Sequence, residues 1–555
     1  MFLCSFDQIN CEDLEKCSPN LSSSPKIQWM IPRSLYWSIF FLVIIRIAWS
    51  EQASKLPNFL ICVSESHTAH LFGSLSRYGS ELNPTPSLSK IAQQGYFHEL
   101  AYCTNANQRS SAFCLQTGKT KNFDLENYAK QDFLAQQLQL LGYETAFFGG
   151  WEWDASPNEL GYSSWGTLDN NHIFYNPKVK TPQGNYILEG YSTDIITDLA
   201  IRWMEEDRDL EKPFFVVLSY QATQRPWIPP VRMVEKLNNE WFDTPGSFFT
   251  DFSNRTPSNK YQDMNIAQNL HEIHDLFLVR WLDENESKKT TSILEQNLES
   301  MNDEQLSAWK LSWKPQNEAF ARESYDPESL SVWKFQRFFK NYLRCLLTID
   351  ENIGRIFDKL ASKPIHETHF IYTSERGRFC GEFGWFGSQW MYEPSSRIPF
   401  IFTSLNGEFT PPLDQNQIFL DTDAYALIKD LTQDGEPKHL KMAREQRTKR
   451  SGTNSLLFAH DRFPGEYRVT PHIGLLHGKF KIIHYYPFDE WEFYDLEKDP
   501  FEENNLYENH SQQGLITSYK EKLIQAAKLQ YLDEYTFDYS ENWKRQQRSP
   551  DQKSR

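Results

Sequence analysis

The sequence predicts an α/β protein with a large, mostly parallel sheet that helices cover on both faces. Short apolar runs read as buried strands, and the segments between them have helical periodicity. Aromatic residues make up 15% of the 555 residues, which requires a large core and argues against disorder. Strands that alternate with helices over hundreds of residues are typical of parallel sheets. In such sheets the ligand site lies at the carboxyl ends of the strands.

The individual elements follow from these patterns in chain order. Apolar runs that predict strands of the sheet occur at 56–63, 142–149, 213–219 and 368–374. Helices are predicted at 88–95, 193–204 and 342–360. Gly95 stands where the first of these helices should end.

The pattern divides the chain into a main domain at 56–405 and a smaller α+β piece at 406–540. Within the main domain, the polar and charge-rich stretch 235–330 reads as a helical and loop insertion. In the smaller piece, hairpin strands are predicted over 474–486 and 490–494, and a closing helix over 516–532. Residues 541–555 read as a polar tail.

The N-terminal region contains one long apolar run, at residues 34–50. It is shorter than the roughly 18–20 apolar residues of a spanning helix and fits the central region of a signal peptide. We predict that Met30 is the true start, that residues 1–29 are a mis-assigned extension, and that 30–50 is cleaved near Ser50. The alternative is a signal anchor that starts at Met1. Both predict export to the periplasm or the extracellular space, with membrane attachment only if 34–50 is uncleaved.

Composition excludes several classes of protein. The 57 Lys and Arg residues against 74 Asp and Glu give a net charge of −17, which argues against nucleic acid as a partner. The 8 cysteines form no Cys-x-x-Cys pair, so a zinc site built from thiolates is not expected.

The predicted strand-end loops and several later segments carry a family pattern. The matching segments, in order, are 57–66, 117–119, 149–151, 190–198, 225–227, 349–355, 384–386, 390–393 and 493–500. With these segments the chain resembles, over about residues 56–535, the sulfatases of the alkaline-phosphatase superfamily. It is most similar to bacterial exported sulfatases assigned to N-acetylglucosamine-6-sulfate and related glycan sulfates. The resemblance implies an alkaline-phosphatase-like fold with a C-terminal antiparallel sheet, calcium as cofactor, a sulfated glycan ligand and sulfuric ester hydrolysis.

The chain departs from that pattern at the positions that carry the chemistry. The resemblance places the family nucleophile, a cysteine converted to formylglycine, at Gln108. The positions equivalent to other catalytic and sulfate-binding residues are Ala112, Gly150, Glu152, Gln224 and Ser388. The positions equivalent to metal ligands are Glu65, Ser66, Glu375 and Arg376.

Arg376 is the change with the clearest electrostatic meaning, because a guanidinium cannot ligate a metal cation. We therefore predict that Arg376 replaces calcium and pairs with Glu65 and Glu375, as suits the bidentate geometry of arginine. On this hypothesis the protein has no cofactor. Weak metal binding through the two glutamates is the alternative, although calcium prefers about six to eight oxygen ligands.

Other residues near the implied site admit both functional and structural interpretations. Arg225 and His472 match family positions near the substrate, where they could contact a sugar or serve the fold. Trp151, Trp227 and Trp390 could stack on a carbohydrate.

Further serines and cysteines are more readily explained as structural. Ser110 and Ser111 read as polar loop or capping residues rather than a relocated nucleophile, and Cys114 reads as a core residue. The pairing of Cys103 and Cys380 is left open.

Three functions are consistent with these observations. The favoured prediction is a non-catalytic sulfatase-family protein, a pseudoenzyme, that binds a sulfated glycan or another partner. The second is a hydrolase of different chemistry built on Glu65, Glu152 and Glu375, since paired carboxylates can act as acid and base. The third is an active sulfuric ester hydrolase with an unrecognised nucleophile, which rests on family analogy alone.

Overall fold

The computed structural model describes residues 56–105, 108–120, 132–260, 262–278, 292–361, 367–405, 414–432, 438–451, 454–461 and 465–529. The predicted signal segment at 30–50, the extension before it and the tail at 541–555 lie outside these residues. Within the described ranges, no helix is both long and apolar enough to span a membrane.

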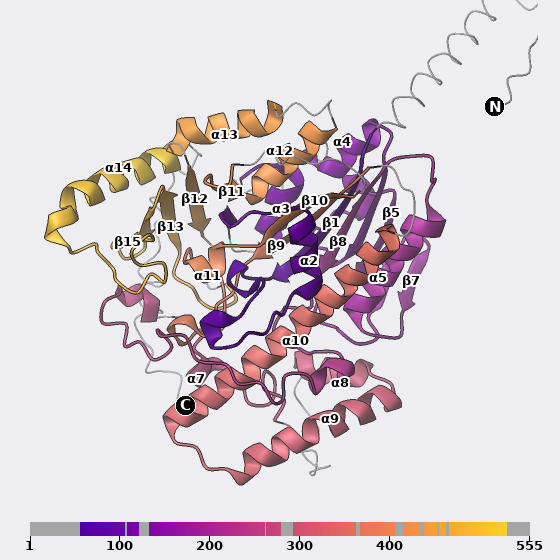
Figure 1. Ribbon diagram of the computed structural model, residues 1–555, viewed down its shortest axis with the longest axis horizontal. Coiled ribbons are helices and arrows are strands. Elements are labelled where there is room, and N and C mark those ends of the chain that lie inside the picture. The colour runs from indigo at the N-terminus through magenta and orange to yellow at the C-terminus, as the bar shows by residue number, and fades with distance from the viewer. Residues whose placement is uncertain are drawn as a thin grey trace, which may run out of the picture. The chain divides into compact units, whose positions relative to one another are not determined.

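A nine-stranded, mostly parallel sheet forms the centre of the fold (Figure 1), which confirms the predicted fold class. The strand order is β2-β10-β9-β1-β8-β4-β5-β6-β7. The parallel strands are β1 (Asn58–Ser66), β4 (Glu144–Gly149), β5 (Ser164–Leu168), β8 (Phe214–Tyr220) and β9 (Thr368–Arg376). The antiparallel edge strands are β2 (Tyr96–Phe97), β10 (Phe400–Leu405), β6 (Lys178–Thr181) and β7 (Gly184–Ile187).

Helices cover both faces of this sheet. One group contains α2 (Pro86–Gln94) and α5 (Ser192–Arg202), which both contact α10 (Pro327–Ala361). The other contains α3 (Gln108–Thr117), α4 (Leu134–Leu140) and α12 (Asp421–Leu431). Successive residues of β4 face the two helix groups in turn, as strand geometry requires. Phe148 packs on Trp203 at the end of α5. Phe147 packs on Tyr162, whose hydroxyl donates a hydrogen bond to Gln116 of α3.

The helix α10 is much longer than the sequence pattern predicted. It begins at Pro327 rather than near Tyr342, and its first turns bury Phe335, Phe338 and Phe339. Those aromatic residues are the packing surface against the preceding segment, where Phe242 contacts Phe339 edge to face. The periodic signal at 342–360 therefore marked only the second half of one helix.

The stretch predicted as an insertion contains short helices and one long one. They are α7 (Ile266–Asn269), α8 (Ile293–Ser300) and α9 (Asp303–Arg322), and α6 (Val231–Val234) lies just before the stretch. Trp309 and Trp313 of α9 are fully buried and pack against Phe277. Trp309 also contacts Tyr175 edge to face, and through this contact the aromatic cluster attaches the polar stretch to the rest of the molecule.

The C-terminal part forms a separate four-stranded antiparallel sheet. Its strands are β12 (Ser455–His460), β13 (His472–His477), β14 (Phe480–Tyr485) and β15 (Glu490–Asp495). The two hairpins were predicted, but β12 was not. The helix α14 (Gln513–Leu529) packs on this sheet, where Tyr519 contacts Phe493. The helix α13 (Lys438–Ser451) and the strand pair β3 (Ala101–Tyr102) and β11 (Phe419–Leu420) complete the region. The residue boundaries between the two parts stay predictions.

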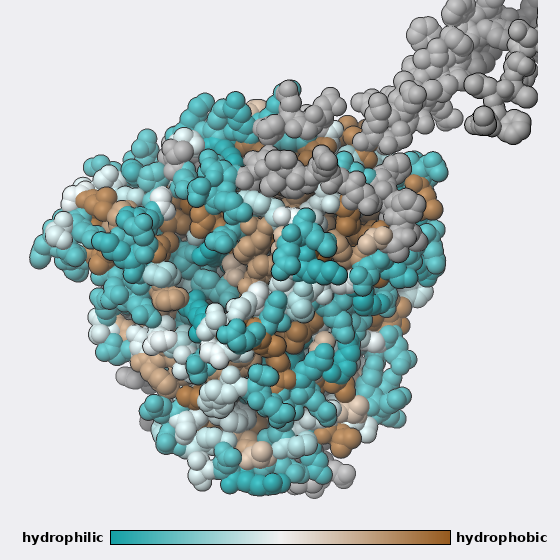
Figure 2. All heavy atoms as spheres, in the orientation of Figure 1, coloured by the Kyte–Doolittle hydropathy of each residue, from teal (hydrophilic) through white to brown (hydrophobic). Residues whose placement is uncertain are grey.

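The face of the molecule drawn in Figure 2 is largely hydrophilic, with hydrophobic residues in small separate areas. Such scattered apolar residues are normal on protein surfaces. The large apolar content is instead in the core around β1, β8 and β9, whose residues Phe59, Leu60, Phe214 and Phe370 are fully buried.

Candidate functional site

The predicted metal-ligand positions meet at the carboxyl ends of two central strands. β1 ends at Ser66 and β9 ends at Arg376, and these two residues are register partners in the parallel pair. Glu65 and Glu375 precede them on the same strands. The structure therefore brings the predicted positions together at the edge of the sheet where α/β proteins bind ligands.

A buried ion cluster occupies this edge. Arg376 donates its Nε proton to Oε1 of Glu65 at 3.0 Å, and its Nη2 bonds the same oxygen. Arg378 donates from Nε to the Ser66 hydroxyl at 2.9 Å and places Nη2 3.4 Å from Oε2 of Glu65. The Ser66 hydroxyl in turn donates to Glu65. The predicted pairing of Arg376 with Glu65 is present in the structure.

Two members of the cluster were missed in the sequence. Arg378 is fully buried, donates to the carbonyl of Phe386 at 3.1 Å and bonds the Tyr467 hydroxyl at 3.0 Å. Glu466 lies 3.3 Å from Arg376. The signal for Arg378 was its place two residues after Arg376, beside an aromatic-rich segment that had to be buried. Nothing near Glu466 in the sequence indicated that the loop before β13 returns to this site.

The cluster holds its members in their charged forms. Burial alone would raise the pKa of Glu65, but Arg376 and Arg378 stabilise the carboxylate, and the net shift is downward. Burial would likewise lower the pKa of Arg376, but the Glu65 and Glu466 carboxylates raise it above its usual value. Removal of one member of a buried ion pair typically costs about 3–5 kcal/mol of stability. The charged groups of the cluster therefore stabilise one another, and the loss of any one of them should destabilise the fold.

These residues do not fit calcium. The ion takes about six to eight oxygen ligands, whereas the Glu65 carboxylate already accepts hydrogen bonds from two guanidinium groups and one hydroxyl. Arg376 brings a positive charge to the position itself. In the part of the chain that the structure describes, no group of three or more His, Cys, Asp or Glu side chains is arranged to hold a metal ion.

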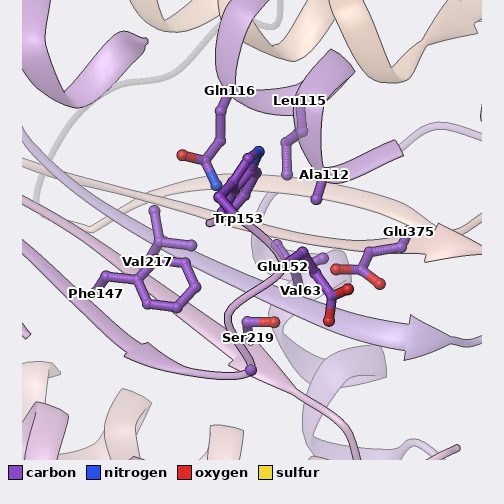
Figure 3. Close-up of a pocket in the computed structure, with 11 residues that line it drawn as sticks. Val63, Ala112, Leu115, Gln116, Phe147, Glu152, Trp153, Val217, Ser219 and Glu375 are labelled. Carbon is purple, nitrogen blue, oxygen red and sulfur yellow. The ribbon is translucent and has the colours of Figure 1, made fainter. Parts of the chain in front are cut away.

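Next to the ion cluster lies a small cavity of about 10 Å³ (Figure 3). Its walls are Val63, Ala112, Leu115, Gln116, Phe147, Gly150, Glu152, Trp153, Val217, Ser219 and Glu375. Four of these, Ala112, Gly150, Glu152 and Glu375, are positions that the sequence singled out. A cavity of this size has room for about one water molecule.

The ionisable side chains that line the cavity are the two glutamates, Glu152 and Glu375. Figure 3 shows the side chains of Glu152 and Glu375 at the same end of the cavity, beside Ser219. Glu152 accepts a hydrogen bond on Oε1 from the Asn171 amide at 2.7 Å. Burial raises the pKa of Glu152, and the nearby Glu65 carboxylate raises it further. Arg376 and Arg109 oppose this increase in the pKa of Glu152 but do not outweigh it.

The remaining replaced positions surround this region. Gln108 is the first residue of α3, and its side chain lies outside the described part of the structure. Gln224 is buried in the loop after β8, where its backbone carbonyl accepts a bond from Trp227. Ser388 is fully buried in the loop that follows Arg378.

Arg225 and His472 differ in their availability to a ligand. Arg225 donates from Nε and Nη2 to the two carboxylate oxygens of Asp275, at 2.7 and 2.6 Å, and its side chain is 29% exposed. His472 is fully buried; its Nδ1 donates to the carbonyl of Thr470 and its Nε2 accepts from the backbone of Met391. Of its two predicted roles, the structure supports the structural one. A contact between Arg225 and a sugar stays a prediction.

The expectation of a tryptophan-lined sugar cleft is mostly wrong. Trp227 and Trp390 are fully buried, because they pack against Phe338 and His472. Trp151 is partly exposed and donates its indole proton to the carbonyl of Ala155 at 2.9 Å. Aromatic stacking at this site could therefore involve only Trp151 of the three.

The predicted structural residues lie in the core. Ser111 donates to the carbonyl of Asn105, and Cys114 is buried beside Thr104. Ser110 is fully buried as well. The described cysteines are all buried, and Cys62, Cys103, Cys345 and Cys380 form no disulfide bond.

A parallel sheet with its site at the strand ends, joined to a small antiparallel sheet, is the architecture of alkaline-phosphatase-like hydrolases. The family profile described as Sulfatase matches residues 57–416, and the profile of the N-sulphoglucosamine sulphohydrolase C-terminal region matches 381–529. The chain belongs to the sulfatase family.

Individual relatives agree with this assignment. An N-acetylglucosamine-6-O-sulfatase of Bacteroides thetaiotaomicron is 31% identical over 483 residues, which cover 82% of this chain and 84% of that protein. The uncharacterized sulfatase YidJ of Escherichia coli is 23% identical over 487 residues, covering 82% and 84%. The solved structure of BT4656 with its substrate D-glucosamine-2-N,6-O-disulfate has a TM-score of 0.77 and 28% identity, covering 87% of this chain and 100% of that one.

Proposed function

We propose that this sulfatase-family protein binds a carbohydrate, or a partner that carries one, without hydrolysing sulfate esters. One observation carries the proposal: Glu65, Arg376 and Arg378 form a buried ion cluster. The family resemblance equates the positions of Glu65 and Arg376 with those of calcium ligands. A site that is filled by its own cations cannot also hold the metal. We further propose that the protein acts without calcium and in an exported location.

The residues that remain cannot supply the chemistry of sulfate transfer. A nucleophile must be activated, and charge that develops in the transition state needs nearby cations or hydrogen-bond donors. Gln108 offers a carboxamide, which is not convertible to formylglycine and is a poor nucleophile. Ala112 and Gly150 bring no charge to the cavity, and Glu152 brings a carboxylate.

The relatives support a carbohydrate as the class of partner. One is named an N-acetylglucosamine-6-O-sulfatase, and another was solved with a sulfated glucosamine as its substrate. This chain covers more than four fifths of both proteins. We therefore propose a glucosamine-containing glycan as the ligand, bound at the carboxyl edge of the sheet.

A second candidate function is a hydrolase of different chemistry that uses Glu152 and Glu375. The observation in its favour is that both carboxylates line one cavity and that burial raises the pKa of Glu152. A carboxyl group with a raised pKa beside an ionised one is a known arrangement for acid and base catalysis.

The test is hydrolysis of a panel of sulfate, phosphate, phosphonate and glycosidic substrates, with calcium and with chelator. The panel is repeated with Gln108→Cys that is co-expressed with a formylglycine-generating enzyme. We expect no turnover by either protein, because the cations and the metal site are lost together with the nucleophile. Calcium-dependent turnover by the unmodified chain would overturn the proposal. Chelator-resistant turnover that Glu152→Gln abolishes would support the second candidate.

A further inference from the structure

We infer that the cavity beside Glu152 receives a free hydroxyl group of the bound glycan, at the place where an active sulfatase would hold a sulfate ester. The protein would then recognise the glycan with this sulfate absent. The inference rests on the proposed glycan-binding function and specifies its ligand. Its basis is the size, the charge and the hydrogen-bonding geometry of the cavity.

The first argument is size. The cavity measures about 10 Å³, roughly the space of one water molecule. A hydroxyl oxygen fits such a space, but a sulfo group, with its sulfur and additional oxygens, is several times larger. Other walls of the cavity are side chains of the close-packed core, among them Val63, Phe147 and Val217. Enlargement of the cavity would therefore disturb the centre of the sheet.

The second argument is charge. Glu152 and Glu375 line the cavity, and Glu65 lies close enough to raise the pKa of Glu152. An anionic sulfate ester beside these carboxylates would be repelled, and like-charge contacts are an efficient way to reject a ligand. Two cations oppose this charge at Glu152, Arg376 and Arg109. Arg376 is buried and bound to Glu65, and Arg109 is paired with Asp154 at 3.0 Å.

The third argument is the orientation of Glu152. The Asn171 amide bonds its Oε1 at 2.7 Å and so fixes the plane of the carboxyl group. A carboxylate has a second oxygen that also accepts hydrogen bonds. Figure 3 shows this carboxyl group at the end of the cavity next to Ser219. A sugar hydroxyl that enters there can donate to Glu152, whereas a sulfate ester has no proton to donate.

The experiment compares the binding of D-glucosamine and D-glucosamine 6-sulfate to the full chain. A second pair of probes is a chemically desulfated heparin oligosaccharide and its sulfated parent, titrated by calorimetry. We expect the unsulfated member of each pair to bind about tenfold more tightly or better. Glu152→Gln keeps the shape of the side chain but removes its charge, and should reduce this preference to about threefold or less. Glu323→Gln, at an exposed position after α9, should keep the preference.

The outcomes separate this inference from the proposed function. Tighter or equal binding of the sulfated probes without sulfate release would overturn the hydroxyl site but leave a non-catalytic glycan-binding protein. Absence of binding to all four probes would also overturn the hydroxyl site. Release of sulfate would overturn both proposals. A preference for unsulfated probes that Glu152→Gln leaves unchanged would show that the discrimination lies elsewhere, and would overturn the inference as well.

Discussion

Two buried ion clusters in this protein contrast in composition and in their relation to the family. At the sheet edge, Arg376 and Arg378 contact Glu65, and the sequence predicts that Glu65 and Arg376 stand in place of metal ligands. In the C-terminal part, Lys481 lies 2.8 Å from Glu393 and 2.6 Å from Glu502, and Glu393 belongs to a segment that matches the family. With Glu466, the first cluster sets two arginines against two carboxylates, whereas in the second Lys481 faces two carboxylates.

The comparison shows what the family-matching segments do in the fold. Glu393 accepts a bond from the Tyr102 hydroxyl at 3.0 Å, so it connects the main domain with β14 through Lys481. Asp350, in another matching segment, accepts bonds from the backbone of Ser87 and Leu88 at the start of α2. These two family-matching segments therefore join elements of the fold.

The largest expected effect is at the sheet edge. Arg376→Met should lower the free energy of unfolding by about 3–5 kcal/mol, because it leaves Glu65 buried with one of its two cations. Glu466→Gln is the matched control: Glu466 pairs with the same arginine but is partly exposed, so its loss should cost about 0–1 kcal/mol. Chemical denaturation measures both values. Equal losses for the two variants would contradict the assignment of Glu65 as the principal partner.

The second effect depends on pH. Burial raises the pKa of Glu502 to about 7, so its folded pKa exceeds the unfolded one. Protonation of Glu502 stabilises the folded state. This stabilisation is fully present at pH values below the pKa of Glu502 in the unfolded chain, and it is lost as pH rises through about 7, the pKa in the folded state.

Lys481→Met therefore leaves two carboxyl groups that can be protonated in acid but not in base. We expect a loss of about 3 kcal/mol near pH 8 and a much smaller loss near pH 5. The measurement is the free energy of unfolding of the variant and the parent across that range. A loss that does not change with pH would show that Glu502 stays charged throughout, and Glu502→Gln should flatten the profile of the parent.

The third effect is smaller because it concerns one helix end. Asp350→Asn keeps the shape of the side chain but weakens the two bonds to the backbone at Ser87 and Leu88. We expect a loss of about 1 kcal/mol, typical of a helix N-terminal cap. The control is Glu351→Gln, the next residue, which pairs with Arg232 at the surface and should change stability by less than about 0.5 kcal/mol. A larger loss in the control would contradict the capping role.

The sequence predicted the parallel sheet because buried strands such as 213–219 are short apolar runs bounded by polar residues. It predicted the meeting of Glu65 and Arg376 because both follow such strands in a known pattern. It did not predict Arg378, whose contacts to Ser66 and Tyr467 depend on how two distant loops fold together. It misjudged Trp227 and Trp390 because aromatic side chains suit both a core and a sugar site, and only three-dimensional packing separates the two.

The smallest expected effect is the response of protein stability to calcium. The absence of stabilisation by calcium is itself the expected result. A metal that binds the folded state at about 100 times its dissociation constant would stabilise it by about 2.7 kcal/mol. We expect no shift of the unfolding temperature, within about 1 °C, between excess calcium and excess chelator, because Arg376 already neutralises Glu65. The same titration with Arg376→Asn separates two explanations: calcium stabilisation that appears only in this variant would show that the arginine alone displaced the ion. Stabilisation of the parent by calcium would mean that the Glu65 cluster opens to admit a metal. The prediction that Arg376 takes the place of the metal would then be wrong.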